Sequence, residues 1–245
     1  MSLPVSPNTV TPDEFIALTQ SWQQLTASGD IQALVACLNT SSGVLSNYAY
    51  LPGDLVTQLL GSSATVAIRT KFVLVGDSPA FSMVVYGIDQ PGNATTPYFQ
   101  MGVASVPATI VNDMPPPIAN EEIPAAQAAA WTLNWSAINP GNLTFAPFDS
   151  SYGMLMGYTF PLDDFKKAWE PATGQSPALW LSFDMHAPTE NPEGPLLFST
   201  IVTLNTVPSG DTPGIFKLSP SVSYFDVSRP CPPACGYAAP ELFSK

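Results

Sequence analysis

The hexapeptide FSMVVY at residues 81–86 returns as FSTIVT at residues 198–203, 117 positions later. Aromatic and β-branched residues dominate both copies, as is typical of strands that are buried on at least one face. A strand that occurs twice at such a separation predicts a chain built from two copies of one unit of about 110 residues.

The correspondence extends to other segments of the chain. A stripe with spacings of three, four and three residues occurs twice at an offset of 113, and this spacing places side chains on one face of a helix. Its members are Phe15, Leu18, Trp22 and Leu25 in the first copy, and Ala128, Trp131, Trp135 and Ile138 in the second. We match Tyr48 and Tyr50 with Tyr158 and Phe160 at an offset of 110, and residues 98–99 with 224–225. Alternating residues of 66–72 and 179–185 predict one more strand in each copy.

These segments predict an α+β fold of two tandem pseudo-symmetric repeats. Each repeat is expected to contain a helix, a strand, a short helix and two or three antiparallel strands. We place an N-terminal arm at 1–10, repeat 1 at 11–105, a Pro-rich linker at 106–123, repeat 2 at 124–230 and a Cys/Pro tail at 231–245. Strands and helices do not alternate regularly enough for a doubly wound parallel sheet. The first helix should begin at Thr11, with Pro12 and Glu14 completing a capping box.

The composition restricts the classes of partner. Hydrophobic residues make up 45% of the chain and charged residues 11%, against about 25% charged residues in typical soluble domains. A formal net charge of −12 repels phosphate, so nucleic acids and anionic membranes are excluded as expected partners. No apolar run reaches the length of a membrane span, and no signal peptide is visible, so membrane insertion is not expected. The compartment stays open between the cytoplasm, as the default, and the surface of an extracellular particle.

The cysteines favour a disulfide over a metal site. Cys231 and Cys235 are separated by three residues, including Pro232 and Pro233, which permits a small disulfide loop or a simple structural tail. A structural zinc ion needs four ligands, and the remaining candidates, Cys37 and His186, fall in different halves. No metal ion is therefore predicted, and Cys37 is expected to be a small buried hydrophobe.

His186, the only histidine, follows Asp184 on a predicted strand, and Ser182 and Ser199 lie near it in sequence. A nucleophile, a histidine and a carboxylate are the parts of a hydrolase site, but the chain has no strand–turn–helix Gly-x-Ser-x-Gly motif. Glycine-rich phosphate loops and calcium loops are absent from the sequence as well. We therefore predict no catalytic residue and no cofactor, and we expect His186 to mark an exposed strand end.

The interpretation that remains is a non-enzymatic structural or assembly protein that acts through protein–protein contacts or self-assembly. A surface poor in charge and rich in Thr, Asn, Pro and aromatic residues resembles the composition of interfaces. Trp180 should lie on the strand face opposite Leu179 and Leu181, together with His186. The predicted interaction surface comprises Trp180, His186, Pro115, Pro116, Pro117, Pro232 and Pro233. The alternatives are an extracytoplasmic module that binds a glycan or a peptide and, third, a hydrolase that uses His186.

Overall fold

The computed structural model describes residues 6–39, 43–105, 108–109, 123–151, 153–168, 176–187, 193–207, 216–217, 224–225 and 229–230. The predicted disulfide at Cys231 and Cys235 and the prolines of the predicted surface (Pro115, Pro116, Pro117, Pro232 and Pro233) lie outside the described residues.

The chain folds as a mixed α+β structure, as predicted. The helices are α1 (Pro12–Ser28), α2 (Ile31–Leu38), α3 (Gly53–Leu60), α4 (Ala125–Ser136) and α5 (Leu162–Ala168), with short 3-10 turns at Pro140–Asn142 and Ala146–Phe148. The longer strands are β2 (Tyr48–Pro52), β3 (Ala67–Val75), β4 (Ala80–Ile88), β10 (Gly157–Pro161), β11 (Ser176–His186) and β12 (Leu197–Val207). The shorter ones are β1 (Asn8–Val10), β5 (Tyr98–Gln100), β6 (Gly102–Ala104), β7 (Ala108–Thr109), β8 (Asp149–Ser150), β9 (Gly153–Met154), β13 (Phe216–Lys217), β14 (Tyr224–Phe225) and β15 (Arg229–Pro230).

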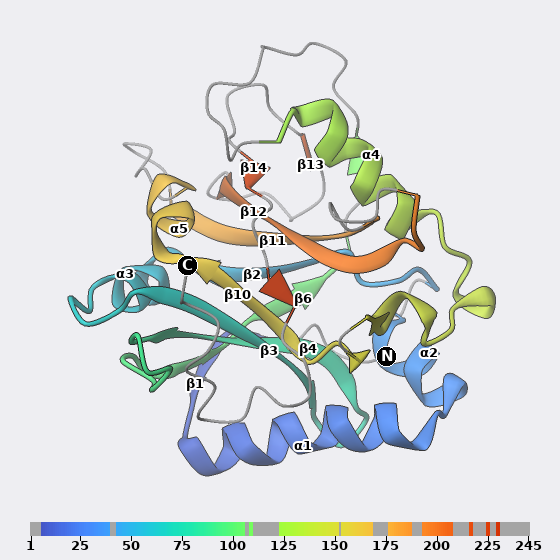
Figure 1. Ribbon diagram of the computed structural model, residues 1–245, viewed down its shortest axis with the longest axis horizontal. Coiled ribbons are helices and arrows are strands. Elements are labelled where there is room, and N and C mark those ends of the chain that lie inside the picture. The colour runs from blue at the N-terminus through green and yellow to red at the C-terminus, as the bar shows by residue number, and fades with distance from the viewer. Residues whose placement is uncertain are drawn as a thin grey trace.

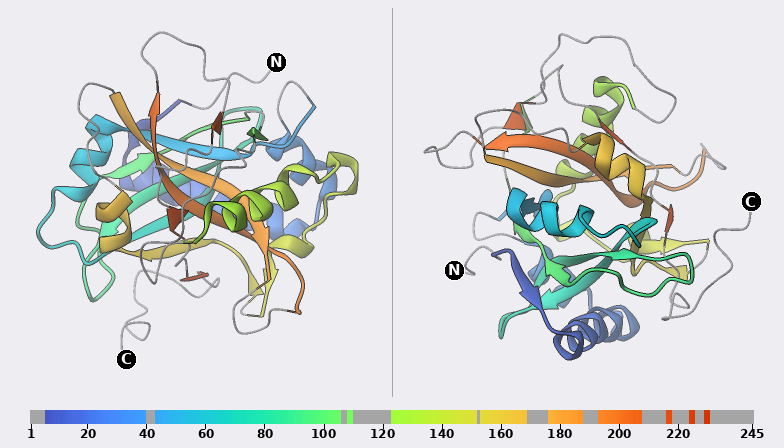
Figure 2. Two further views of the ribbon diagram at one scale, coloured as in Figure 1. Left: turned by 90° about the horizontal axis from the view of Figure 1, so that it is seen from above. Right: turned by 90° about the vertical axis from the view of Figure 1, so that its left-hand side faces the viewer.

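Two antiparallel sheets lie face to face (Figure 1). The first sheet has the order β1-β5-β4-β3-β10-β15, and the second has the order β14-β12-β11-β2-β6. Helix α1 covers the outer face of the first sheet and α4 covers the outer face of the second, so the two helices lie on opposite sides of the sheet pair (Figure 2, right). Helices α3 and α5 contact each other at one end of the sheets.

Each sheet contains a strand from the other half of the chain. Strand β2 pairs with β11, with Ala49 opposite Leu181, and β10 pairs with β3, with Phe160 opposite Ile68. Segments before and after the predicted linker therefore share both sheets rather than forming one sheet each.

The main core lies between the inner faces of the two sheets and consists largely of aromatic rings. Trp22 contacts Phe72, Phe81 and Phe148 edge to face, with ring centroids 5.4–5.6 Å apart, an arrangement that suits the quadrupoles of the rings. Both Trp22 and Trp135 are completely buried, as the predicted helical stripes require. This aromatic core explains how a chain with so little charge holds its sheets together.

The start of α1 confirms the predicted capping box. The Glu14 backbone N–H donates to the Thr11 hydroxyl at 3.3 Å, and the Thr11 backbone N–H donates to the Glu14 carboxylate at 2.7 Å. The bond from the Thr11 backbone N–H, followed by one from the Thr11 hydroxyl at 2.8 Å, lowers the pKa of the Glu14 carboxyl. Before the helix, β1 extends the first sheet by pairing with β5, so the described part of the N-terminal arm is an edge strand.

The structure corrects one detail of the predicted correspondence. Tyr48 and Tyr50 project from the outer face of their sheet, where they contact Trp180, whereas Tyr158 and Phe160 belong to the core between the sheets. Because side chains alternate along a strand, matching residues on opposite faces is a register error of one position. The two segments therefore do not occupy equivalent positions at an offset of 110.

Candidate functional site

The outer face of β11 carries the two described residues of the predicted interaction surface. Leu179, Leu181 and Phe183 point into the core between the sheets, while Trp180 lies in a separate cluster on the outer face. The prediction that Trp180 and Leu179 occupy opposite faces is confirmed. Asp184 and His186 are separated from Trp180 by even numbers of positions, so all three lie on the same face of β11. Helix α4 packs against this strand.

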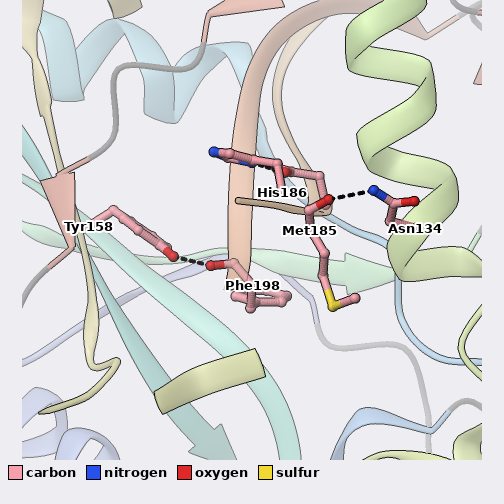
Figure 3. A network of polar contacts seen from close by, with 6 residues as sticks. Asn134, Tyr158, Met185, His186 and Phe198 are labelled. Carbon is pink, nitrogen blue, oxygen red and sulfur yellow. Dashed lines mark hydrogen bonds and ion pairs between the residues drawn. The ribbon is translucent and has the colours of Figure 1, made fainter. Parts of the chain in front are cut away.

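His186 is held by contacts from its own strand and from α4. Its Nδ1 lies 2.7 Å from Oδ1 of Asp184, which is completely buried. Its ring stacks on Trp131 with centroids 4.0 Å apart, and Asn134, one helical turn further along α4, donates to the Met185 carbonyl at 2.9 Å (Figure 3). Only 15% of the His186 side chain is exposed. The expectation of an exposed strand end is therefore wrong, because α4 packs over it.

The arrangement of His186 and Asp184 is that of a base oriented by a carboxylate. A hydrolase also needs a nucleophile at the other ring nitrogen. In the β11–β12 ladder, Ser199 is opposite Asp184, and the residue opposite His186 is Leu197. The strand register therefore brings the candidate serine to the carboxylate's position in the ladder rather than to that of the imidazole.

Trp180 forms a compact aromatic cluster with two tyrosines of β2. Its ring stacks on Tyr48 at 4.4 Å, and Tyr50 lies 6.1 Å away. Tyr48 and Trp180 are only 1% and 5% exposed, whereas Tyr50 is half-buried. Burial raises the pKa of Tyr48 to about 12. A glycan-binding platform needs exposed ring faces, so this cluster does not favour the glycan-binding alternative.

The described residues contain neither a cluster of candidate metal ligands nor a helix that could cross a membrane. No group of three or more His, Cys, Asp or Glu side chains that could hold a metal ion occurs among these residues. Cys37 lies in the core, as predicted, and burial raises the pKa of its thiol to about 12. None of the described helices is long and apolar enough to cross a membrane.

The buried cation Arg69 is not among the site residues that the sequence predicts. Arg69 lies on β3 and is 5% exposed, and Lys71 follows it on the same face of the strand. Two basic residues at alternate positions of a strand that is apolar apart from Thr70 are a visible signal, because arginine is almost never fully buried unless it is paired. The chain contains only seven basic residues in total, and this composition gives no indication that two of them lie close together on β3.

Comparison with known proteins gives no relative: no protein-family model, curated protein or solved structure matches this chain.

Proposed function

We propose that this protein is a non-enzymatic structural or assembly component, built from a duplicated unit, that acts through protein–protein contacts. The observation that carries the proposal is the lack of charge on three of its helices. Helix α1 has no charged residue after its first turn, and α2 and α4 have none at all.

Apart from Asp13 and Glu14 in the first turn of α1, the exposed positions of these helices are apolar, amide-bearing or hydroxyl-bearing. Ile16 on α1, Ile31 on α2 and Leu133 on α4 are 39%, 43% and 38% exposed. Helices that face solvent usually carry charged residues on the outer side, whereas the centres of protein interfaces are depleted of charge. Uncharged outer helices on both sides of the sheet pair therefore suit contacts with neighbouring proteins.

The strand ladders support the duplication. If Phe81 corresponds to Phe198, their ladder partners make Leu74 correspond to Met185. Continuing in register to the exchanged strands makes Leu51 correspond to Phe160, and Pro52 to Pro161. Strands β4 and β12 also pair with β5 and β14, and their ladder partners make Phe99 correspond to Phe225. The two sheets are thus consistent with one plan, in which each unit contributes two strands to the other unit's sheet.

Two buried hydrogen bonds obey the same correspondence. Trp22 Nε1 donates to the Leu155 carbonyl at 2.9 Å, and Trp135 Nε1 donates to the Ser46 carbonyl at 2.7 Å. Leu155 and Ser46 each lie two residues before the exchanged strand, β10 and β2 respectively. A duplicated unit accounts for both bonds, because in each copy the helix tryptophan donates to the carbonyl two residues before the exchanged strand.

Sedimentation velocity of the full-length protein tests the proposal. Gln24→Lys on α1 and Ala130→Lys on α4 each add one charge to an exposed position. At least one of them should weaken self-association about ten-fold, because a charge buried in an interface without a partner is unfavourable. Gln58→Lys is the matched control, since it adds the same charge to α3, which already carries Asp54. A protein that stays monomeric and captures no partner from its native extract would refute the assembly proposal.

The pair of His186 and Asp184 favours a second candidate, a hydrolase. A panel of ester, peptide and glycoside substrates tests it, with His186→Ala as the comparison. Turnover by the native protein that disappears in His186→Ala would move the hydrolase ahead of the assembly component. Equal, background rates for both proteins would remove it.

A further inference from the structure

A pocket of about 200 Å³ opens on the outer face of the first sheet, beside α1. Phe15 and Tyr98 form an aromatic wall, Thr19 and Gln20 contribute neutral polar groups, and Arg69 and Lys71 supply positive charge. None of the described lining residues is acidic. The whole chain has nineteen acidic and seven basic residues, so its net charge is negative. The charge of this pocket, which contains two cations, is therefore opposite in sign to the net charge of the protein.

The guanidinium of Arg69 is placed to receive a ligand. Its Nε donates to the Thr159 hydroxyl at 3.3 Å, which is its one hydrogen bond among the described residues. The two terminal nitrogens, with four N–H groups between them, lie 3.9 and 4.0 Å from where a Cβ on Gly92 would stand. Gly92 also lines the pocket, so these donors lie at the pocket wall with their hydrogen-bonding capacity unused.

The acidic residue of the adjacent loop does not neutralise this charge. Asp89 accepts hydrogen bonds from the backbone N–H and the side-chain amide of Asn93, at 2.7 and 3.1 Å. These bonds, the side-chain amide's first, lower the pKa of the Asp89 carboxyl. Asp89 is thus engaged within its own loop, and among the described residues no carboxylate pairs with the almost fully buried guanidinium, although a buried cation requires a counter-ion.

We infer that this pocket binds a carboxylate, held by Arg69 and Lys71, with a small apolar part against Phe15 and Tyr98. The planar fork of an arginine matches the two oxygens of a carboxylate. A monoanion suits the site better than phosphate, because the net charge of −12 repels a second negative charge. The carboxylate comes either from a free small molecule or from an acidic residue of a second copy of this chain.

Thermal unfolding of the full chain tests the site, with benzoate and acetate as probes. Inorganic phosphate and sodium chloride at equal ionic strength serve as comparisons, because screening alone alters the stability of a charged protein. We expect benzoate to raise the melting temperature most, since a ligand that binds only the folded state stabilises it. The dissociation constant for benzoate should rise about ten-fold or more in Arg69→Met and in Lys71→Met.

Lys166→Met on α5 is the matched control, because it removes an exposed lysine outside the pocket; it should leave benzoate binding unchanged. Lys71→Met, at a half-buried position, keeps the test decisive if Arg69→Met fails to fold. Dissociation of oligomers by benzoate would assign the natural occupant to a second copy, and an unchanged oligomeric state would assign it to a free carboxylate. Stabilisation that is no greater than that by chloride, that is greater for phosphate, or that is equal in all variants would overturn the inference. A monomeric protein that captures no partner from its native extract but binds benzoate would refute the assembly proposal and leave this site standing.

Discussion

At the level of single residues, Trp22 and Trp135 connect each outer helix to the strand that crosses between the halves. Each indole is completely buried, and each N–H bonds to a carbonyl just before an exchanged strand. The helical spacing predicted that both rings are buried. It could not predict their acceptors, because Leu155 and Ser46 lie far away in the sequence and present only backbone atoms.

Trp135→Ala should lower the free energy of unfolding by about 3–5 kcal/mol, the usual cost of removing a large buried aromatic side chain. Trp135→Phe keeps most of the ring and removes the donor to Ser46, so it should cost about 1–3 kcal/mol through the buried carbonyl that is left unsatisfied. Urea unfolding measures both values. Leu133→Ala, on the same helix at a residue 38% exposed, is the control and should change stability little. A Trp135→Ala protein as stable as the control would show that the ring is not part of the core.

The buried thiol of Cys37 should lower the free energy of unfolding at alkaline pH. Burial raises its pKa from 9.0 to about 12, so the folded state keeps a proton that the unfolded state releases. The stabilisation is complete below pH 9 and is lost as the pH rises toward 12, at up to about 1.4 kcal/mol per pH unit. Tyr48 adds to this loss above pH 10, because its pKa is raised to about 12 as well.

Urea unfolding of Cys37→Ala and of the native chain between pH 9 and pH 10 isolates the contribution of the thiol, since Tyr48 is present in both proteins. Cys37→Ala should show a shallower decline of stability with pH than the native chain, whatever its stability at neutral pH. Identical slopes for the two proteins would mean that the Cys37 thiol is not protected from solvent.

At the level of elements, the sequence predicts what is local and misses what depends on a distant neighbour. The start of α1 follows from Thr11, Pro12 and Glu14 alone, and the structure confirms it. The match of Tyr48 and Tyr50 with Tyr158 and Phe160 fails, because similarity between aromatic side chains does not indicate the sheet face on which each side chain lies. Strand alternation identifies a buried face, but nothing local says that β2 pairs with β11.

The cap of α1 is open to a direct test. Thr11→Ala removes the acceptor for the Glu14 N–H and should lower stability by about 1 kcal/mol. Thr11→Ser keeps the hydroxyl and should retain most of the native stability. Thermal unfolding compares the three proteins, and equal melting temperatures for Thr11→Ala and Thr11→Ser would show that the capping bond contributes nothing.

For the whole molecule, the exchange of β2 and β10 has a consequence that separate domains would not share. Each sheet contains two strands from beyond residues 106–123, β10 and β15 in the first sheet and β2 and β6 in the second, and the core between the sheets contains side chains from both halves. Neither half can therefore cover its apolar surface alone, and the pair should unfold as one cooperative unit.

An engineered protease site between Ala119 and Asn120 tests this unity, because cleavage there cuts the covalent connection between the halves. The two fragments should remain together in gel filtration, since each holds two strands in the other's sheet, and should separate only in denaturant. Their unfolding should occur in a single transition whose midpoint depends on protein concentration, because the cleaved protein is a two-chain complex. An inserted site of equal length left uncut is the matched control. Two folded fragments that elute separately would show that the halves are independent domains and that the strand exchange does not hold them together.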